Sequence, residues 1–510
     1  MPRPKLFQLT IILLILAYLG VVVLTAWVAD DAFLTLRTVD NFANGYRLNW
    51  NVNERVQIYT HPLWMLLIIP FYLVIENPLF TMYFLTIALS TGTIIIFAKY
   101  FANDFMAAGI GFGALLFSKA FVDYSTSGLE NPLSHLLMIL FLATFLNFDK
   151  KFDEQRILLL SIVAGLAVIN RMDTLLFYIP ALGYALYKVR TPRAWLYAAA
   201  GFLPFLLWEV FSTFYYGFPF PNTAYAKLNT GIDKPLLIRQ GIYYLQDSLL
   251  RDPLSLSLIV FSFVLIVVKR EARRLMIGLG VLVYLIYLVQ IGGDFMSGRF
   301  FSISVLTSVV LITTTIAPRP TKKSWAILIA IILIGFLGPR TPWLNRISNQ
   351  EEFLYHNIAD ERVVYYASTG LLSPEREGEY PNHVWVSKGL QHKELGRELS
   401  IGPVNGMFAF YAGPQLHVVD TYALGDALLA RLPARDQGPF KIGHFIREVP
   451  AGYWDYAVDY GNQIEDPNLA LYYEKLSLVI HGDLFDSQRL IEIWRLNTGY
   501  YDYLISAYVN

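Results

Sequence analysis

Two carboxylates, Asp30 and Asp31, stand next to each other directly after the first apolar segment of the chain. A carboxylate beside an apolar wall can have its pKa raised and act as a base on a hydroxyl group, while its neighbour stays ionised. Arg37 follows in the same segment, and a guanidinium can hold a phosphate and stabilise the charge it gains on leaving. The types and spacing indicate transfer of a group from phosphate to a hydroxyl. The alternative is a pair of helix-end charges that fix the first apolar segment at a membrane surface.

Four other polar segments interrupt the apolar runs and carry residues of the same types. Ionisable groups at membrane depth are costly to bury, so they tend to pair and to line cavities. The segments are DYSTSGLENP (123–132) with Glu130, NRMD (170–173) with Arg171 and Asp173, YYGFPFPNTAYAKL (215–228) with Asn222, Tyr225 and Lys227, and GGDFMSGR (292–299) with Asp294 and Arg299.

Each of these motifs also has a purely structural interpretation. Arg171 and Asp173 could pair within one turn, as could Asp294 and Arg299, and Glu130 could complement the positive end of the helix that follows it. The aromatic residues of 215–220, together with His61 and Trp64, could be interfacial anchors. The motifs are therefore candidates for a site, and their gathering in a few loops favours the functional interpretation.

Composition places the chain in a membrane. Of its 510 residues 55% are apolar and only 16% are charged, with a mean hydropathy of +0.44, whereas soluble domains have about 25% charged residues. There is no cysteine, which excludes disulfides, thiolate catalysis and cysteine-ligated metal sites. The net charge is zero, so nothing in the overall field points to a nucleic-acid partner.

Apolar runs of nearly spanning length predict eleven transmembrane helices. The first run is longer than the core of a signal peptide and lacks a cleavage site, so we interpret it as a span. The predicted spans are 6–28, 79–98, 105–120, 132–148, 156–170, 174–188, 194–214, 254–268, 275–291, 300–316 and 324–338.

Loop charge predicts the orientation. With 62–76 interpreted as an interfacial or re-entrant segment, because it is short and contains Pro70, the inner loops hold 16 Lys and Arg in 38 residues and the outer loops 9 in 94. If that segment spanned, every later loop would change sides. The expected protein is a polytopic α-helical protein of the cytoplasmic membrane, with residues 1–340 as its membrane domain, its N-terminus inside, and residues 341–510 as an extracytoplasmic soluble α+β domain. In this tail we predict strands at RVVYYAS, MFAFYAG and LHVVDT, and helices at GDALLARL and PNLALYYEKL.

Taken together, the motifs resemble those of the GT-C membrane glycosyltransferases, in particular the terminal arabinofuranosyltransferase family of mycobacterial cell walls and its bacterial relatives. The segment DDAFLTLRTVDNFANGYRLNWNVNERVQIYTHPLW (30–64) looks like the first outer loop of that family. The similarity continues in order through STSGLENPL, NRMDTLL, YYGFPFPNTAYAKL, GGDFMSGRFF, VVDTYALGDALLAR (418–431) and GHFIREVPAGY (443–453).

The resemblance implies an enzyme that moves a sugar from a polyprenyl-phosphate donor to a glycan or glycolipid acceptor of the cell envelope, outside the membrane. An Asp of the 30–31 pair would be the catalytic base. The residues that would line the substrate sites are Arg37, His61, Trp64, Glu130, Arg171, Asp173, Asn222, Tyr225, Lys227, Asp294 and Arg299, with Asp420, Tyr422, Asp426, Arg431 and His444 of the tail near the acceptor.

Departures from the family pattern leave the identity of the sugar open. The chain has Asn51-Val52-Asn53 where Asn-Pro-Gly is common and His61 where Ser is usual, so a pentofuranose is one candidate sugar but arabinose in particular does not follow. Asp30, Asp31 and Glu130 offer oxygen ligands of the kind that Mg²⁺, Mn²⁺ or Ca²⁺ prefers, but their spacing does not decide whether a metal binds. A transporter and a non-enzymatic protein of envelope or motility-apparatus assembly stay as alternatives, and the tail could be a structural cap alone.

Overall fold

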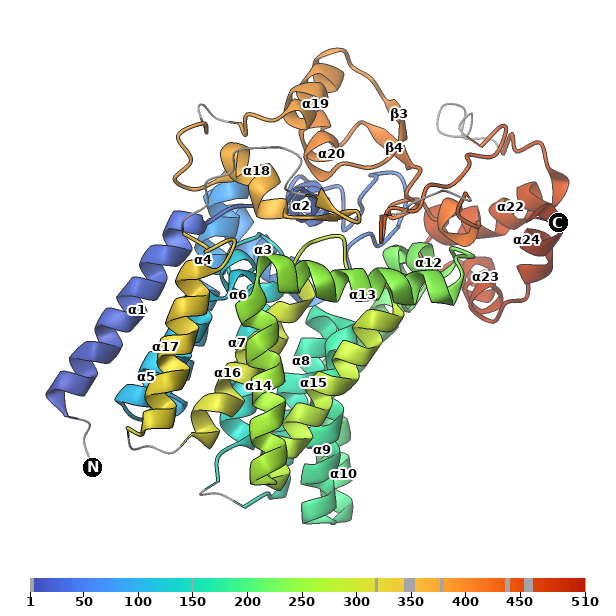
Figure 1. Ribbon diagram of the computed structural model, residues 1–510. Helices are drawn as coiled ribbons and strands as arrows, with labels where there is room; N and C mark the ends of the chain where they lie inside the picture. The colour runs from blue at the N-terminus through green and yellow to red at the C-terminus, as the bar shows by residue number, and fades with distance from the viewer. Residues whose placement is uncertain are drawn as a thin grey trace. The chain divides into compact units, whose positions relative to one another are not determined.

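The computed structural model describes residues 4–148, 151–316, 320–343, 354–376, 380–435, 441–453 and 462–509, and most of these residues are helical (Figure 1). Parts of the predicted loops 149–156 and 317–323, and the first residues of the predicted tail domain after 343, lie outside the described residues. The chain divides into two compact units. The first unit comprises residues 1–29, 79–205 and 234–376, and the second comprises residues 30–78, 206–233 and 377–510.

The first unit is a bundle of apolar helices in which α14, α15 and α16 pack against one another (Figure 1). Two short strands, β1 (Leu354–Tyr355) and β2 (Ile358–Ala359), pair antiparallel in it. Its helices are α1 (Lys5–Thr25), α4 (Pro78–Tyr100), α5 (Phe105–Phe117), α6 (Lys119–Asp123), α7 (Asn131–Phe145), α8 (Glu154–Asn170), α9 (Leu175–Val189), α10 (Pro192–Gly201), α13 (Lys234–Arg251), α14 (Pro253–Lys269), α15 (Ala272–Gln290), α16 (Ser302–Thr315), α17 (Lys322–Leu337) and α18 (Glu361–Thr369), with the 3₁₀ turns η1 (Met172–Thr174) and η2 (Arg299–Phe301).

Each of the eleven predicted spans overlaps a helix. Three described helices, α1, α4 and α15, are long and apolar enough to cross a membrane alone. Two bent pairs, α10 with α11 (Leu203–Tyr215) and α13 with α14, pass the same test together, and several shorter apolar helices accompany them. The multi-pass helical architecture is confirmed by these findings, and the total of eleven spans stays a prediction.

Small residues let the helices of the first unit approach closely. A Cβ on Gly280 of α15 would lie 2.2 Å from the carbonyl oxygen of Phe177 in α9. A Cβ on Gly165 of α8 would lie 2.9 Å from the carbonyl oxygen of Gly201, where α10 ends. Because lipid provides no hydrophobic force between helices, such close packing is a main source of cohesion in membrane bundles.

The second unit combines two early segments with the tail. Its helices are α2 (Asp30–Ala43), α3 (Pro62–Ile75), most of α11, α12 (Asn222–Leu228), α19 (Val384–Glu394), α20 (Gly406–Ala412), α22 (Pro467–His481), α23 (Ser487–Asn497) and α24 (Asp502–Val509), and its parallel strands β3 (Leu399–Gly402) and β4 (His417–Asp420) pair with each other. The predicted re-entrant segment 62–76 forms α3, whose 14 residues would extend about 21 Å, less than a hydrocarbon core of about 30 Å.

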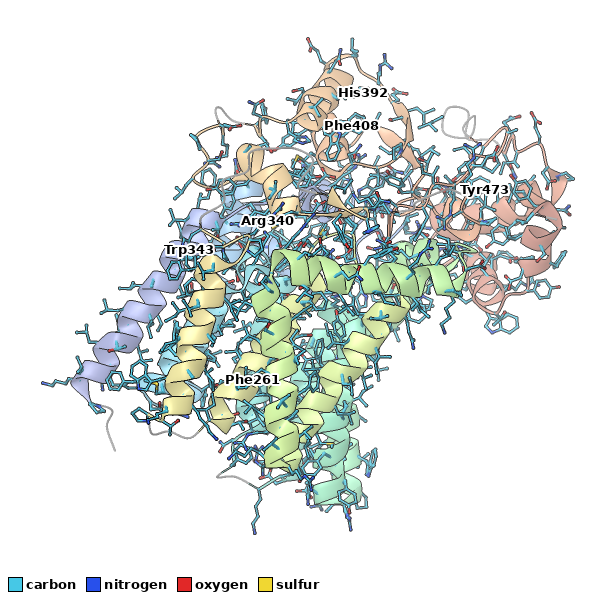
Figure 2. The ribbon with its side chains drawn as sticks, in the orientation of Figure 1. Phe261, Arg340, Trp343, His392, Phe408 and Tyr473 are labelled. Carbon is cyan, nitrogen blue, oxygen red and sulfur yellow. The ribbon has the colours of Figure 1, made fainter. Side chains whose placement is uncertain are left out.

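Two of the three predicted tail strands are wrong. LHVVDT contains β4 as expected, but RVVYYAS lies in α18 and MFAFYAG in α20. Aromatic and β-branched residues favoured strands locally, yet tertiary contacts decide: α20 packs on α19, where the His392 and Phe408 rings meet edge to face at 5.1 Å (Figure 2). The predicted helix GDALLARL is only a 3₁₀ turn, η4 (Leu429–Arg431), whereas PNLALYYEKL begins α22 as predicted.

Candidate active site and comparison with known proteins

The two adjacent carboxylates begin α2 and have different environments. Asp30 is 7% exposed, and its two carboxylate oxygens accept hydrogen bonds from the backbone N–H groups of Gly406 (2.7 Å) and Met407 (2.8 Å). Those amides begin α20, and intrahelical bonds cannot satisfy the first N–H groups of a helix. Asp30 therefore caps α20, whereas Asp31 is only half-buried.

The pKa of Asp30 is higher than that of an ordinary carboxyl group, mainly because the side chain is buried. Desolvation raises the pKa of Asp30 to about 7, the nearby charge of Asp31 acts in the same direction, and the two backbone donors and Lys441 act against them. Gly406 must be a glycine here, because a Cβ at this position would lie 2.1 Å from the carbonyl oxygen of Asp30. The arrangement fixes Asp30 and places Asp31 beside it at the head of α2.

Arg37 joins three backbone segments of the second unit through hydrogen bonds. Its guanidinium donates to the carbonyl oxygens of Trp50 (3.0 Å), Ala409 (2.7 Å) and Leu416 (2.5 Å), and it lies over the Trp50 ring. The three carbonyls come from segments far apart in the sequence, so the guanidinium positions the loop after α2 against α20. The predicted contact of Arg37 with substrate stays a prediction.

His61 and Trp64 lie at the start of α3 and are both buried. The Nε2 atom of His61 is 2.7 Å from the Thr35 hydroxyl of α2, which joins α3 to α2. The role of His61 and Trp64 in substrate binding stays a prediction.

Asn222 connects the loop 215–228 to the tail. Its side-chain amide donates to the carbonyl oxygens of Ala423, Leu424 and Asp426 and accepts a hydrogen bond from Arg431 (3.0 Å). The Arg431 guanidinium stacks over the rings of Phe218 (4.1 Å) and Tyr225 (4.9 Å). The structure thus brings together four residues that the motifs predicted, Asn222, Tyr225, Asp426 and Arg431.

Asp420 organises the turn after β4. It is fully buried and accepts hydrogen bonds from four backbone N–H groups, those of Val404, Tyr422, Leu424 and Gly425, at 2.7–3.0 Å. Burial raises its pKa to about 6 against the effect of those donors. With its oxygens occupied by backbone amides, Asp420 shapes the turn.

Lys441, Lys227 and His444 lie near one another within the second unit. Lys441 interacts electrostatically with Asp30, and burial together with the charges of Lys441 and Lys227 lowers the pKa of His444 well below its ordinary value. The His444 ring packs edge to face on Tyr422 at 4.8 Å. Neutral His444 and two lysines can receive an anionic group.

In the first unit, Glu130 joins two arginines. Its carboxylate is 1% exposed and lies 3.2 Å from Arg171 and 3.1 Å from Arg299. Arg171 also makes a bidentate pair with Asp173 at 2.7 Å, and Arg299 lies 3.7 Å from Asp294. The five predicted residues form one buried cluster of three carboxylates and two guanidiniums. The two structural interpretations, Arg171 with Asp173 and Arg299 with Asp294, describe real pairs within this larger network.

Two features escaped the sequence analysis. Burial, together with the nearby charge of Asp426, raises the pKa of Glu54 to about 8. Burial is also the main cause that raises the pKa of Asp426 to about 7, and the charge of Asp420 acts in the same direction. In the first unit, Asp360 pairs with Lys119 and with Arg340, which Figure 2 labels, while Asp123 pairs with Lys119 and Arg362. The i,i+4 spacing of Lys119 and Asp123 was the available signal.

A cleft of about 580 Å³ also opens in the second unit, with Asp40, Tyr72, Glu76 and Tyr411 among its lining residues. Asp40 follows Asp31 by nine residues, which places the two on opposite sides of α2. The cleft is thus separate from the head of α2. Among the described residues, no group of three or more His, Asp and Glu side chains could hold a metal ion.

No family model matches the sequence. Curated relatives do: the chain is 27% identical over 413 residues to the terminal β-(1→2)-arabinofuranosyltransferase of Mycobacterium tuberculosis, covering 69% of this chain and 64% of that protein. It is 26% identical over 361 residues to the protein of the same name from Corynebacterium glutamicum, covering 60% of this chain and 50% of that protein. The chain therefore spans half of one relative and less than two thirds of the other.

The fold also matches a solved structure. The crystal structure of ArnT from Cupriavidus metallidurans bound to undecaprenyl phosphate superposes with a TM-score of 0.52 at 12% sequence identity, covering 84% of this chain and 88% of that one. At this identity the match shows the fold alone. The resemblance found in the motifs is confirmed: the chain is a distant homologue of the terminal arabinofuranosyltransferases and has an ArnT-like fold.

Proposed function

We propose that this protein is a GT-C glycosyltransferase that moves a sugar from a polyprenyl-phosphate donor to a hydroxyl of an envelope glycan or glycolipid on the outer face of the membrane. The observation that carries the proposal is the contrast between the two carboxylates at the head of α2. Asp30 is buried and fixed by two amides of α20, whereas Asp31 is only half-buried. Adjacent carboxylates in different environments are a common way of dividing chemical roles.

In this proposal Asp31 is the catalytic base. It takes the proton of the acceptor hydroxyl as the hydroxyl oxygen forms a bond to the anomeric carbon. The bond from that carbon to the phosphate oxygen breaks, and polyprenyl phosphate leaves with the electron pair. Asp30 is a positioning residue, since its hydrogen bonds to α20 set the direction in which the head of α2 presents Asp31.

Lys227 and Lys441 are proposed to bind the phosphate of the donor. Their charges already influence His444 and, for Lys441, Asp30. Fixed cations stabilise the charge that the leaving phosphate gains as the bond breaks. The ArnT structure contains undecaprenyl phosphate, and the relatives are named for arabinofuranose transfer. A polyprenyl-phosphate arabinofuranose is accordingly the first donor to test.

The test is a transfer assay with purified protein in lipid vesicles, a panel of polyprenyl-phosphate sugars and an envelope-glycan acceptor. We expect release of polyprenyl phosphate with one donor class. Lys441→Gln should raise the KM for that donor about tenfold or more, whereas the matched variant Lys393→Gln, at an exposed position of α19, should leave it unchanged. Absence of turnover with every donor, in protein that folds and binds lipid, would contradict the proposal.

A further inference from the structure

The exposed part of α23 is mostly apolar, and its one partly exposed charged residue, Arg495, pairs with Glu492 at 2.9 Å. Its exposed apolar residues are Leu490, Ile491 and Trp494, the last 65% exposed. The charged Arg489 and Glu492 are buried instead. A helix on the surface of a soluble domain normally shows the opposite arrangement, with charges outward and apolar residues inward.

Arg489 is buried because it fastens α23 to the end of α11. Its guanidinium donates to the carbonyl oxygens of Phe214 and Tyr215, each at 2.9 Å. Asn497, at the other end of α23, donates to the carbonyl oxygen of Gly217 at 2.7 Å. Helix α23 is thus attached at both ends to the last residues of α11 and the turn that follows.

The same apolar character continues onto α11. With α10 it passes the length and composition test for a membrane span, and its outward residues include Leu207 and Val210, which are exposed. The Phe214 ring contacts Phe485, which is 84% exposed, at 5.4 Å. The exposed side chains of α11 and α23 therefore belong to one connected surface within the second unit.

Aromatic residues extend this surface beyond α23. Tyr500 is 58% exposed and Tyr503 is 60% exposed. Trp and Tyr prefer the headgroup region of a bilayer, because their rings are apolar and their N–H or O–H groups need a polar partner. Exposed apolar and aromatic residues that gather in this way often mark an interaction site in proteins.

We propose that the surface formed by Phe485, Leu490, Ile491, Trp494, Tyr500 and Tyr503 lies in the lipid headgroup layer and anchors the tail to the bilayer. The occupant is lipid because the surface continues from a helix pair that passes the length and composition test for a membrane span, and because it is rich in the aromatic types of the interface. The proposal concerns membrane attachment and does not depend on the transfer reaction.

The absence of cysteine from the chain makes a direct test simple. Single-cysteine variants Trp494→Cys, Leu490→Cys and the control Gln391→Cys, at an exposed position of α19, are spin-labelled in the full chain in nanodiscs. Accessibility of each label to apolar O₂ and to water-soluble nickel chelate is then measured by power saturation. At positions 494 and 490 we expect the label to be more accessible to O₂ than to the nickel chelate. At position 391 we expect the reverse.

Either of two results would overturn the proposal. Labels at 494 and 490 that are as accessible to nickel as the label at 391 would show a water-exposed surface. Labels shielded from both reagents, with spin–spin broadening that disappears on dilution with unlabelled protein, would show that a second copy covers the surface. Retention of the wild-type elution volume in detergent shows that each variant is folded, and two labelled positions guard against a local effect of one substitution.

Discussion

At the residue scale, the molecule keeps several carboxylates where water is excluded. The motifs named Asp30, Asp420 and Asp426, which are buried, and Asp31, which is half-buried; their roles in the reaction stay predictions. The sequence could not predict their partners, because Asp30 bonds to amides 376 residues away in the chain. Nor could it single out Glu54, whose significance depends on the proximity of Asp426.

Glu54→Gln should change how stability depends on pH. The pKa of Glu54 is raised from 4.5 to about 8, so between these values the folded protein holds a proton that the unfolded chain has lost. The contribution of protonated Glu54 to the free energy of unfolding is therefore complete at low pH and is lost as the pH rises towards 8. Relative to the Gln variant, the wild type should lose a few degrees of melting temperature between pH 5 and pH 9. If the melting temperatures of the wild type and the Gln variant change in parallel with pH, the raised pKa of Glu54 is wrong. The control is Glu465→Gln, at an exposed position.

Glu130→Gln should destabilise the first unit, because it removes the charge that holds Arg171 and Arg299. Breaking a buried ion pair on one side costs about 3–5 kcal/mol, and the Gln side chain recovers part of this by hydrogen bonding. Thermal unfolding in detergent measures the loss, with exposed Glu375→Gln as the control. If the cluster also lines a substrate site, as the family resemblance implies, the KM for donor rises in the same variant. An unchanged KM at lowered stability would assign the cluster a structural role alone.

At the element scale, α20 shows why local patterns failed in the tail. MFAFYAG has the aromatic residues of a strand, and the helix exists because Asp30 satisfies its first amides and Phe33 packs on Phe410 at 5.4 Å. Neither partner is near in sequence. The membrane helices were predicted well because their burial in lipid demands long apolar runs that local sequence displays.

Gly406→Ala should disturb the head of α2. The added Cβ would lie 2.1 Å from the carbonyl oxygen of Asp30, so either α20 or α2 must move. If transfer depends on the orientation of Asp31, kcat should fall by about tenfold to a hundredfold, since small misplacements of catalytic groups have effects of this size. Gly183→Ala is the matched control, because a Cβ there meets nothing within 4 Å. Equal activity of the two variants would contradict the coupling of α20 to the reaction.

At the scale of the whole molecule, the chain consists of a helical membrane unit and a second unit assembled from distant segments. The sequence predicted the apolar helices and their order. It did not predict that residues 30–78 and 206–233 belong to the same compact unit as residues 377–510, because such grouping arises from contacts such as those of Asn222 with the tail. The predicted boundary near residue 340 stays a prediction.

Sidedness is testable in the cysteine-free chain. Arg193→Cys lies in a loop predicted to face the cytoplasm, and Gln391→Cys lies in the predicted outer tail, and both positions are exposed. A membrane-impermeant maleimide should label position 391 in intact cells and position 193 only after permeabilisation. The opposite pattern would invert the predicted topology and with it the face on which transfer occurs.

The most direct test of the central claim compares Asp31→Asn with Asp30→Asn in the reconstituted transfer assay, with release of polyprenyl phosphate as the readout. If Asp31 is the base, Asp31→Asn should reduce kcat by about 10²–10⁴-fold at unchanged donor KM. Asp30→Asn should reduce activity less and should lower the melting temperature, because one amide of α20 loses its acceptor. Full activity of Asp31→Asn, in protein that turns over donor, would contradict the account.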